Sequence, residues 1–165
     1  MNIFVVDEDP FSAATSLCDR HVVKMVLESC QMLSTADQLF KNCPKDQRYK
    51  IAYKHHPCVR CLQNSWNYIW LVHHLRGLLN EYTQRFGKIH ACEFLYGKYW
   101  SEFGENQIDF SRTEFPKCMP EELKEGTTVQ AYRRYYSFKQ NHLKSFSYKI
   151  AEHRPIWLPR KDNGK

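Results

Sequence analysis

Hydrophobic residues recur at intervals of three and four along residues 64–86, which is the spacing of one face of an α-helix. The apolar positions are Trp66, Ile69, Trp70, Leu71, Leu75, Leu78, Leu79, Tyr82 and Phe86. Asn64 precedes the series as an N-cap residue, and Gly87 follows it as a stop. The pattern predicts a long middle helix that forms the spine of the core.

Start and stop signals predict the remaining helices. Asp9-Pro10 begins a helix that runs to about residue 41 with a break near Cys18-Asp19, because proline is well suited to the first helical position. Further helices are expected over 90–103, stopping at Gly104, and from a cap at Thr127 or Thr128 to about Ile150. The expected non-helical parts are an extended segment over 3–6, an irregular stretch over 42–57, a loop to Gly126 with one turn at Pro120 to Lys124, and a proline-containing tail over 153–165.

No second strand is evident, so the pattern predicts an all-α protein. Its 165 residues, 42% hydrophobic and 25% charged, suit a single compact helical domain over 1–165. No apolar run approaches the roughly 20 residues that span a bilayer, and no secretory signal is evident. Seven cysteines without such a signal are typical of reduced thiols, so we expect a cytoplasmic protein that does not enter membranes.

Basic residues are concentrated in the last quarter of the chain. Residues 126–165 hold nine Lys and Arg against two Asp and Glu, whereas residues 1–125 hold fifteen against sixteen. Aromatic residues are interleaved with these cations, which is typical of surfaces that bind phosphates and stack on bases. The alternative is a solvated basic helix whose rings face the core. The phosphate-binding candidates are Arg133, Lys139, Lys144, Arg154, Arg160 and Lys161, and the candidates to support a distorted backbone or an extruded base are Tyr132, Tyr136 and Trp157.

A polar stripe lies on an otherwise apolar segment between residues 19 and 33. His21, Lys24, Glu28 and Gln31 fall at spacings of three, four and three, so they share one face of a helix. The apolar residues around them predict that this helix is largely buried. The stripe is either a solvent face with a surface Lys24–Glu28 ion pair, or a set of groups that moves protons and stabilises a cation.

A zinc site is an alternative interpretation of the chemistry of this protein. Residues His55 to Cys61 contain a Cys-x-x-Cys pair with adjacent histidines, and His73, His74, His90, Cys92 and Cys118 are further potential ligands. Structural zinc sites normally show two ligand pairs, and only one is recognisable here. We therefore expect no stoichiometric metal and no other cofactor.

Three groups of residues, in order along the chain, resemble the phage endonuclease V type of pyrimidine-dimer DNA glycosylase. The first is Leu17-Cys18-Asp19-Arg20-His21 followed seven residues later by Glu28. The second runs from His56 through Ser65-Trp66-Asn67-Tyr68 and Glu81 to Arg85-Phe86-Gly87, and the third is Ile150 to Trp157. Together they cover about half the chain.

The resemblance implies an all-α enzyme that kinks duplex DNA at a lesion, extrudes a nucleotide and attacks the sugar C1′ with its own amino terminus. Glu28 would stabilise the cationic sugar and serve the lyase step, and His21 would orient the DNA or that carboxylate. Arg20 and His56 join the candidates for DNA contact. Duplex DNA is the expected partner, with no obligate protein partner, and the host cytoplasm is the expected compartment if a phage encodes the protein.

The nucleophile stays open at this point. The family exposes a threonine amine after removal of the initiator methionine, whereas this chain has Asn2, whose side chain disfavours that removal. The amine of Met1, that of Asn2, or Lys24 as a Schiff-base lysine are the candidates. The alternative functions are a non-catalytic or base-modifying nucleic-acid-binding domain on the same scaffold and a zinc-stabilised interaction module.

Overall fold

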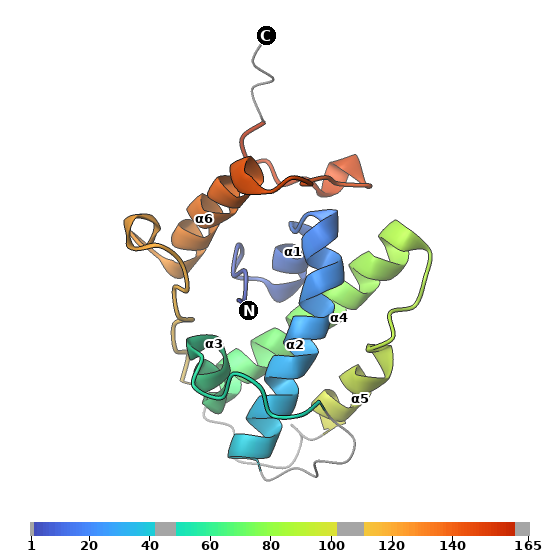
Figure 1. Ribbon diagram of the computed structural model, residues 1–165, viewed down its shortest axis with the longest axis vertical. Helices are drawn as coiled ribbons and strands as arrows, with labels where there is room; N and C mark the ends of the chain where they lie inside the picture. Colours follow the sequence, from blue (N-terminus) through green and yellow to red (C-terminus); the bar gives the residue numbers. More distant parts are fainter. Residues whose placement is uncertain (1, 42–48, 102–110, 161–165) are drawn as a thin grey trace.

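Helices form the regular structure of the protein in a computed structural model, which describes residues 2–41, 49–101 and 111–160 (Figure 1). The α-helices are α1 (Pro10–Thr15), α2 (Asp19–Phe40), α3 (Pro57–Arg60), α4 (Ser65–Phe86), α5 (Glu93–Ser101) and α6 (Thr128–His142). Short 3₁₀ turns are η2 (Cys61–Gln63), η3 (Glu121–Leu123) and η4 (Ala151–His153). These described residues contain no strand, which confirms the all-α class.

The ends of α4 agree with the sequence prediction. The Asn64 side chain accepts a hydrogen bond from the Asn67 amide at 3.1 Å, which satisfies one of the free N–H groups of the first turn. At the other end Gly87 adopts the left-handed conformation, with φ of 64°, and its amide donates to the Thr83 carbonyl. Glycine adopts this conformation at little cost, so it ends the helix where predicted.

Helices α1 and α2 confirm the predicted break. Asp9 caps α1 by accepting from the Ser12 amide at 2.7 Å, and Pro10 is its first residue. The chain then turns through three residues, and α2 begins at Asp19. Helix α4 packs against both α1 and α2, and α1 approaches it closely at Gly77, where an added Cβ would lie 2.7 Å from the Ala14 Cβ.

A buried polar network holds the start of α2. The guanidinium of Arg85 on α4 donates to the Glu81 and Asp19 carboxylates and to the carbonyls of Thr15 and Leu17. Asp19 also accepts from the Ser147 hydroxyl and the Lys149 amide. The C-terminal segment is therefore tied to the beginning of α2.

Helix α6 is shorter than predicted. Thr127 caps it with a reciprocal capping box to Gln130, as expected, but it ends at His142 instead of continuing to Ile150. Leu143 is extended, and the residues after it lie against the start of α2, where Ser147 O accepts from the Asp19 amide and the Tyr148 hydroxyl donates to Ser16 O. These tertiary hydrogen bonds replace those that a longer helix would make.

The N-terminal segment Ile3–Val6 lies between α6 and α2 and is buried (Figure 1). The predicted extended conformation is only partly correct, because the backbone closes two tight turns, from the Val5 amide to Ile3 O and from the Val6 amide to Phe4 O. The core that contains this segment draws residues from Ile3 through to Leu158. Burial of the segment Ile3–Val6 places the beginning of the chain beside α2 and α6.

The remaining expectations meet the structure in different ways. Val23 and Leu27 are exposed, so α2 is less buried than its composition predicts. The turn expected at Pro120 to Lys124 is present as η3, whereas the expected helix stop at Gly104 lies outside the described residues. The six cysteines of the described part are free thiols. None of the described helices is both long and apolar enough to cross a membrane.

Stability is expected to fall in acid because of His74, a fully buried residue of α4 that stacks on Trp70. Burial lowers the pKa of His74 from 6.5 to about 3, so between these values the unfolded chain binds a proton that the folded chain does not. The contribution of His74 to the free energy of unfolding is therefore fully present above pH 6.5. Below pH 6.5 the free energy of unfolding falls by up to about 1.4 kcal/mol per pH unit because of this residue. His74→Phe should flatten the pH dependence of urea unfolding, and identical profiles for the two proteins would contradict this.

Candidate active site

A cleft of about 300 Å³ opens between the N-terminal segment, α2, α6 and the loops before α3 and η3. It gathers four of the five predicted catalytic residues and three of the predicted DNA-contacting ones. The residues that line it are Asn2, Phe4, Arg20, His21, Lys24, Met25, Glu28, His56, Cys118, Tyr135, Lys139 and Leu143. The remaining catalytic candidate, Met1, lies outside the described residues.

Helix α2 supplies the polar stripe of the cleft. His21, Lys24 and Glu28 share one face of the helix, as their spacing predicts, and all three line the cleft. Lys24 Nζ lies 3.2 Å from Glu28 Oε1, with 58% of the Lys24 side chain and 15% of the Glu28 side chain exposed. The carboxylate is thus largely shielded from solvent while the amine reaches it.

His21 is held as a neutral imidazole. Its ring stacks on Phe4, and its Nδ1 lies 2.9 Å from the Tyr136 hydroxyl. Burial, followed by the positive charges of Lys139, Lys24 and Arg20, lowers the pKa of His21 to about 4. The Tyr136 hydroxyl accepts from the Cys18 amide at 2.7 Å, so its own proton is available to His21 Nδ1. In the tautomer whose Nδ1 accepts this proton, Nε2 carries the hydrogen and can donate it to a carboxylate or phosphate oxygen.

The Asn2 side chain fixes the beginning of the chain in the cleft wall. Its Nδ2 donates to the Cys118 carbonyl at 2.8 Å, and its Oδ1 accepts from the Ile3 amide. The Tyr132 hydroxyl lies 2.8 Å from the same Oδ1. Two elements that are distant in sequence, the loop before η3 and α6, therefore hold residue 2.

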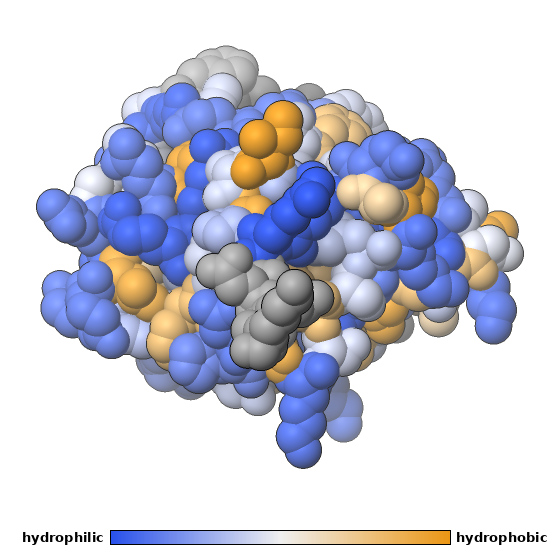
Figure 2. Space-filling model, turned by 90° about the horizontal axis from the view of Figure 1, so that it is seen from above, coloured by the Kyte–Doolittle hydropathy of each residue, from blue (hydrophilic) through white to orange (hydrophobic). Residues whose placement is uncertain are grey.

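The predicted DNA-contacting residues divide into two groups. Arg20, His56 and Lys139 line the cleft, and Lys144 and Arg160 are exposed elsewhere. Figure 2 shows that the end of the molecule formed by α6 and the C-terminal residues is mainly hydrophilic, with hydrophobic residues scattered over it. Lys161 lies outside the described residues.

The other two predicted arginines already have partners within the protein. Arg133 donates to the Val6 carbonyl and pairs with Asp7 at 3.1 Å. Arg154 donates to Gln140 at 2.7 Å and to the Pro159 carbonyl. Both side chains stabilise the fold around α6.

Burial corrects the prediction that Tyr132 and Tyr136 contact DNA. Both rings are fully buried. The Tyr132 hydroxyl hydrogen-bonds to Asn2, and the Tyr136 hydroxyl hydrogen-bonds to His21. Trp157 is half-buried. Its ring lies near the Tyr136 ring and under the Arg133 guanidinium. It packs the tail against α6.

Sequence reasoning missed several cleft residues, among them Phe4, Tyr135 and Cys118. Tyr135 carried a usable signal, because Lys139 lies one helical turn later and its Nζ is 5.0 Å from the Tyr135 ring centre. Cys118 was considered only as a potential metal ligand, and no spacing placed it beside α2, because it comes from an irregular loop. Its thiol accepts a hydrogen bond from Cys58, which lowers the pKa of Cys118 to about 7 and raises that of Cys58. His56, Cys58 and Cys118 are close enough together to share a metal ion.

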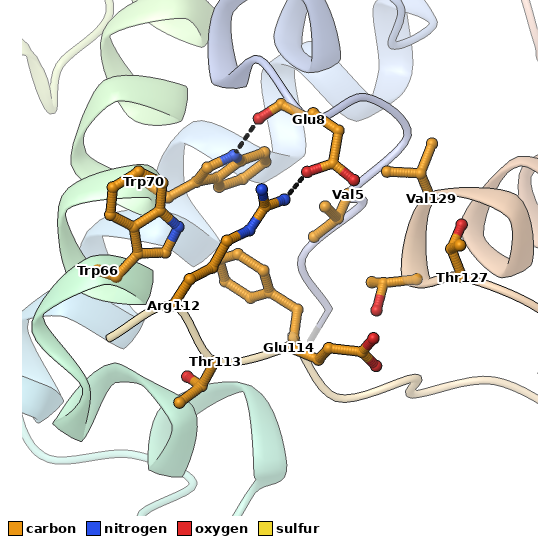
Figure 3. Close-up of a pocket in the computed structure, with 11 residues that line it drawn as sticks. Val5, Glu8, Trp66, Trp70, Arg112, Thr113, Glu114, Thr127 and Val129 are labelled. Carbon is orange, nitrogen blue, oxygen red and sulfur yellow. Dashed lines mark hydrogen bonds and ion pairs between the residues drawn. The ribbon is translucent and has the colours of Figure 1, made fainter. Parts of the chain in front are cut away.

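A second pocket, of about 360 Å³, contains none of the predicted catalytic residues (Figure 3). Trp66 and Trp70 of α4 form one side, and Arg112 reaches across to pair with Glu8. The Trp70 indole donates to the Glu8 carbonyl at 2.8 Å. The two indole rings that line the pocket have flat surfaces on which a planar ring could stack. Trp66 is partly exposed in this pocket, although the periodicity of the sequence placed it in the core.

Comparison with known proteins identifies a family for the first part of the chain. A family model described as pyrimidine dimer DNA glycosylase matches residues 1–93, more than half of the chain. The matched region includes α1 to α4 and the cleft residues from Asn2 to His56. No curated protein and no solved structure matches the chain. The chain therefore belongs to the pyrimidine dimer DNA glycosylase family.

Proposed function

We propose that the protein is a DNA glycosylase with associated lyase activity that acts on duplex DNA damaged by pyrimidine dimers. The observation that carries the proposal is that Asn2, His21, Lys24 and Glu28 line one cleft, within the region that matches the family. Arg20 and Lys139 on the same cleft supply positive charge for the phosphates that flank a lesion.

The α-amine at the amino terminus is the proposed nucleophile. An α-amine has a pKa near 7.7–8 against about 10.4 for a lysine side chain, so a useful fraction of it is neutral at pH 7. Lys24 is the weaker candidate, because its amine is already engaged by the Glu28 carboxylate at 3.2 Å and most of its side chain is in solvent. Asn2 lines the cleft, so an amine at residue 1 or 2 starts within one residue of it.

The proposed reaction begins when the neutral amine donates its electron pair to the sugar C1′. The glycosidic bond breaks, and its electron pair leaves with the base. The Glu28 carboxylate stabilises the positive charge on the sugar. The attached nitrogen then loses one proton, the C1′–O4′ bond breaks with its electron pair and a proton going to O4′, and a protonated imine joins protein and DNA. Removal of a C2′ proton then breaks the bond from C3′ to its phosphate and cleaves the strand. Glu28 is the proposed base, and His21 Nε2–H orients a phosphate or that carboxylate.

Borohydride trapping tests this proposal. Reduction of the imine during reaction with dimer-containing duplex should leave a covalent protein–DNA adduct, and peptide mapping should locate it on residue 1. Lys24→Gln is the informative variant, because it should still be trapped if the α-amine is the nucleophile. An adduct on Lys24 would transfer that role to α2. No adduct with dimer-containing or abasic DNA, despite tight binding, would refute the lyase activity and leave a DNA-binding domain.

The dependence of duplex binding on salt tests the cationic surface. Lys139→Ala and Lys144→Ala should each lower the slope of log K against log salt by about one, because each cation displaces a counterion from a phosphate. Arg133→Ala should change the slope less, because Asp7 already neutralises Arg133. Lys88→Ala, an exposed lysine outside the cleft, is the control. Binding that does not respond to salt would remove the nucleic-acid hypothesis.

A further inference from the structure

Three potential metal ligands meet in the wall of the cleft. Ligand atoms of His56, Cys58 and Cys118 all lie within 4.8 Å of one another. His56 is the N-cap of α3, Cys58 lies in its first turn, and Cys118 comes from the loop before η3. The cluster therefore joins two parts of the chain that are 60 positions apart.

We propose that these three residues, with Cys61 as the fourth ligand, form a zinc site. The Cys58 and Cys118 sulfurs are 3.5 Å apart. Two thiolates bound to one tetrahedral zinc ion, each about 2.3 Å from the metal, lie about 3.8 Å apart. The two sulfurs thus have nearly the separation that a shared zinc ion requires, whereas a disulfide would require about 2.05 Å.

The other two ligands are close to suitable positions. His56 Nδ1 accepts a hydrogen bond from the Cys58 amide at 3.2 Å, so this nitrogen already points toward Cys58. Coordination of zinc through Nδ1 would replace that hydrogen bond. Cys61 lies one turn after Cys58, and its thiol donates to the Cys58 carbonyl at 3.3 Å. Rotation of its side chain would complete the Cys-x-x-Cys pair.

The donor set selects the type of metal. Three thiolates and one imidazole suit zinc, whereas magnesium and calcium prefer oxygen ligands. On binding, each thiol would release its proton to solvent and donate an electron pair to the ion, without any oxidant. This proposal replaces the expectation of no metal, which rested on the single Cys-x-x-Cys pair in the sequence.

The site has a mechanical consequence for the cleft. The Cys118 carbonyl accepts from Asn2 Nδ2, so a metal that holds Cys118 against α3 would also hold residue 2. The proposed site would then join the N-terminal segment, α3 and the loop before η3. Zinc would stabilise the cleft wall without taking part in the reaction.

Metal analysis of the full chain, purified without a histidine tag, tests the proposal in the absence of DNA. We expect one zinc ion per chain, and after exchange with cobalt the thiolate-to-cobalt charge-transfer band and the intense visible bands of a tetrahedral site. Cys58→Ser and Cys118→Ser should each lose most of the bound metal. Cys92→Ser, which alters a buried thiol outside the cluster, should retain it.

Wild-type protein provides the decisive result if a variant fails to fold. Chelation should lower its melting temperature, and added zinc should restore it. Metal-free wild-type protein whose melting temperature does not change with zinc would overturn the proposal, as would a Cys58–Cys118 disulfide in freshly purified protein. Because these measurements use neither DNA nor turnover, they are independent of the proposed glycosylase activity.

Discussion

Glu28→Gln is expected to lower the rate of strand cleavage by at least about 100-fold while leaving affinity for damaged duplex nearly unchanged. The Glu28 carboxylate is largely buried beside Lys24 in the cleft, where its charge acts on a sugar cation with little screening by water. Glutamine has nearly the same shape but no charge, and it cannot accept the C2′ proton. Loss of a positioned acid–base group typically costs 10²–10⁴ in rate.

Single-turnover cleavage and fluorescence anisotropy separate the two effects in this experiment. Glu122→Gln, which removes an exposed carboxylate on η3, is the matched control and should leave both the rate and the affinity unchanged. Joint loss of binding and of cooperative unfolding in Glu28→Gln would instead identify Glu28 as a structural residue, with its ion pair to Lys24 supporting α2.

Helix ends marked by a strong local signal were predicted correctly from the sequence. Asn64 and Gly87 mark α4, and Asp9 with Pro10 marks the start of α1. The end of α6 was predicted too late in the chain, because no glycine marks it. The residues after His142 make tertiary hydrogen bonds to Asp19 instead of helical ones, and no local sequence pattern encodes these bonds. The helix α3 has four residues, too few for a periodicity to appear.

The helical spacing of polar residues predicted one wall of the candidate site. The positions of His21, Lys24 and Glu28 follow from a spacing of three and four, so the pattern identified one wall of the cleft. Cys118 and Tyr135 come from other elements, and only the folded chain brings them to α2. The roles of Tyr132 and Tyr136 were ambiguous in sequence, because a tyrosine suits both a core with a polar partner and a surface that stacks on bases.

Arg85→Leu is expected to lower the free energy of unfolding by about 3–5 kcal/mol. The Arg85 side chain is fully buried, and its guanidinium contacts Glu81 at 2.8 Å and Asp19 at 3.2 Å. The variant would leave both carboxylates buried without their cation, and the carbonyls of Thr15 and Leu17 would lose their donor. Arg85→Lys should recover only part of the loss, because an ammonium cannot reach four acceptors in the same geometry.

Urea unfolding measures this effect against a matched pair on the surface. Arg76→Leu removes the ion pair with Glu93, in which both side chains are more than one third exposed, and should cost at most about 1 kcal/mol. If Arg85 acts mainly by neutralising the buried carboxylates, Glu81→Gln in the Arg85→Leu background should recover stability. Equal losses for Arg76→Leu and Arg85→Leu would show that the buried network does not hold the start of α2, and the position of His21 two residues later would need another explanation.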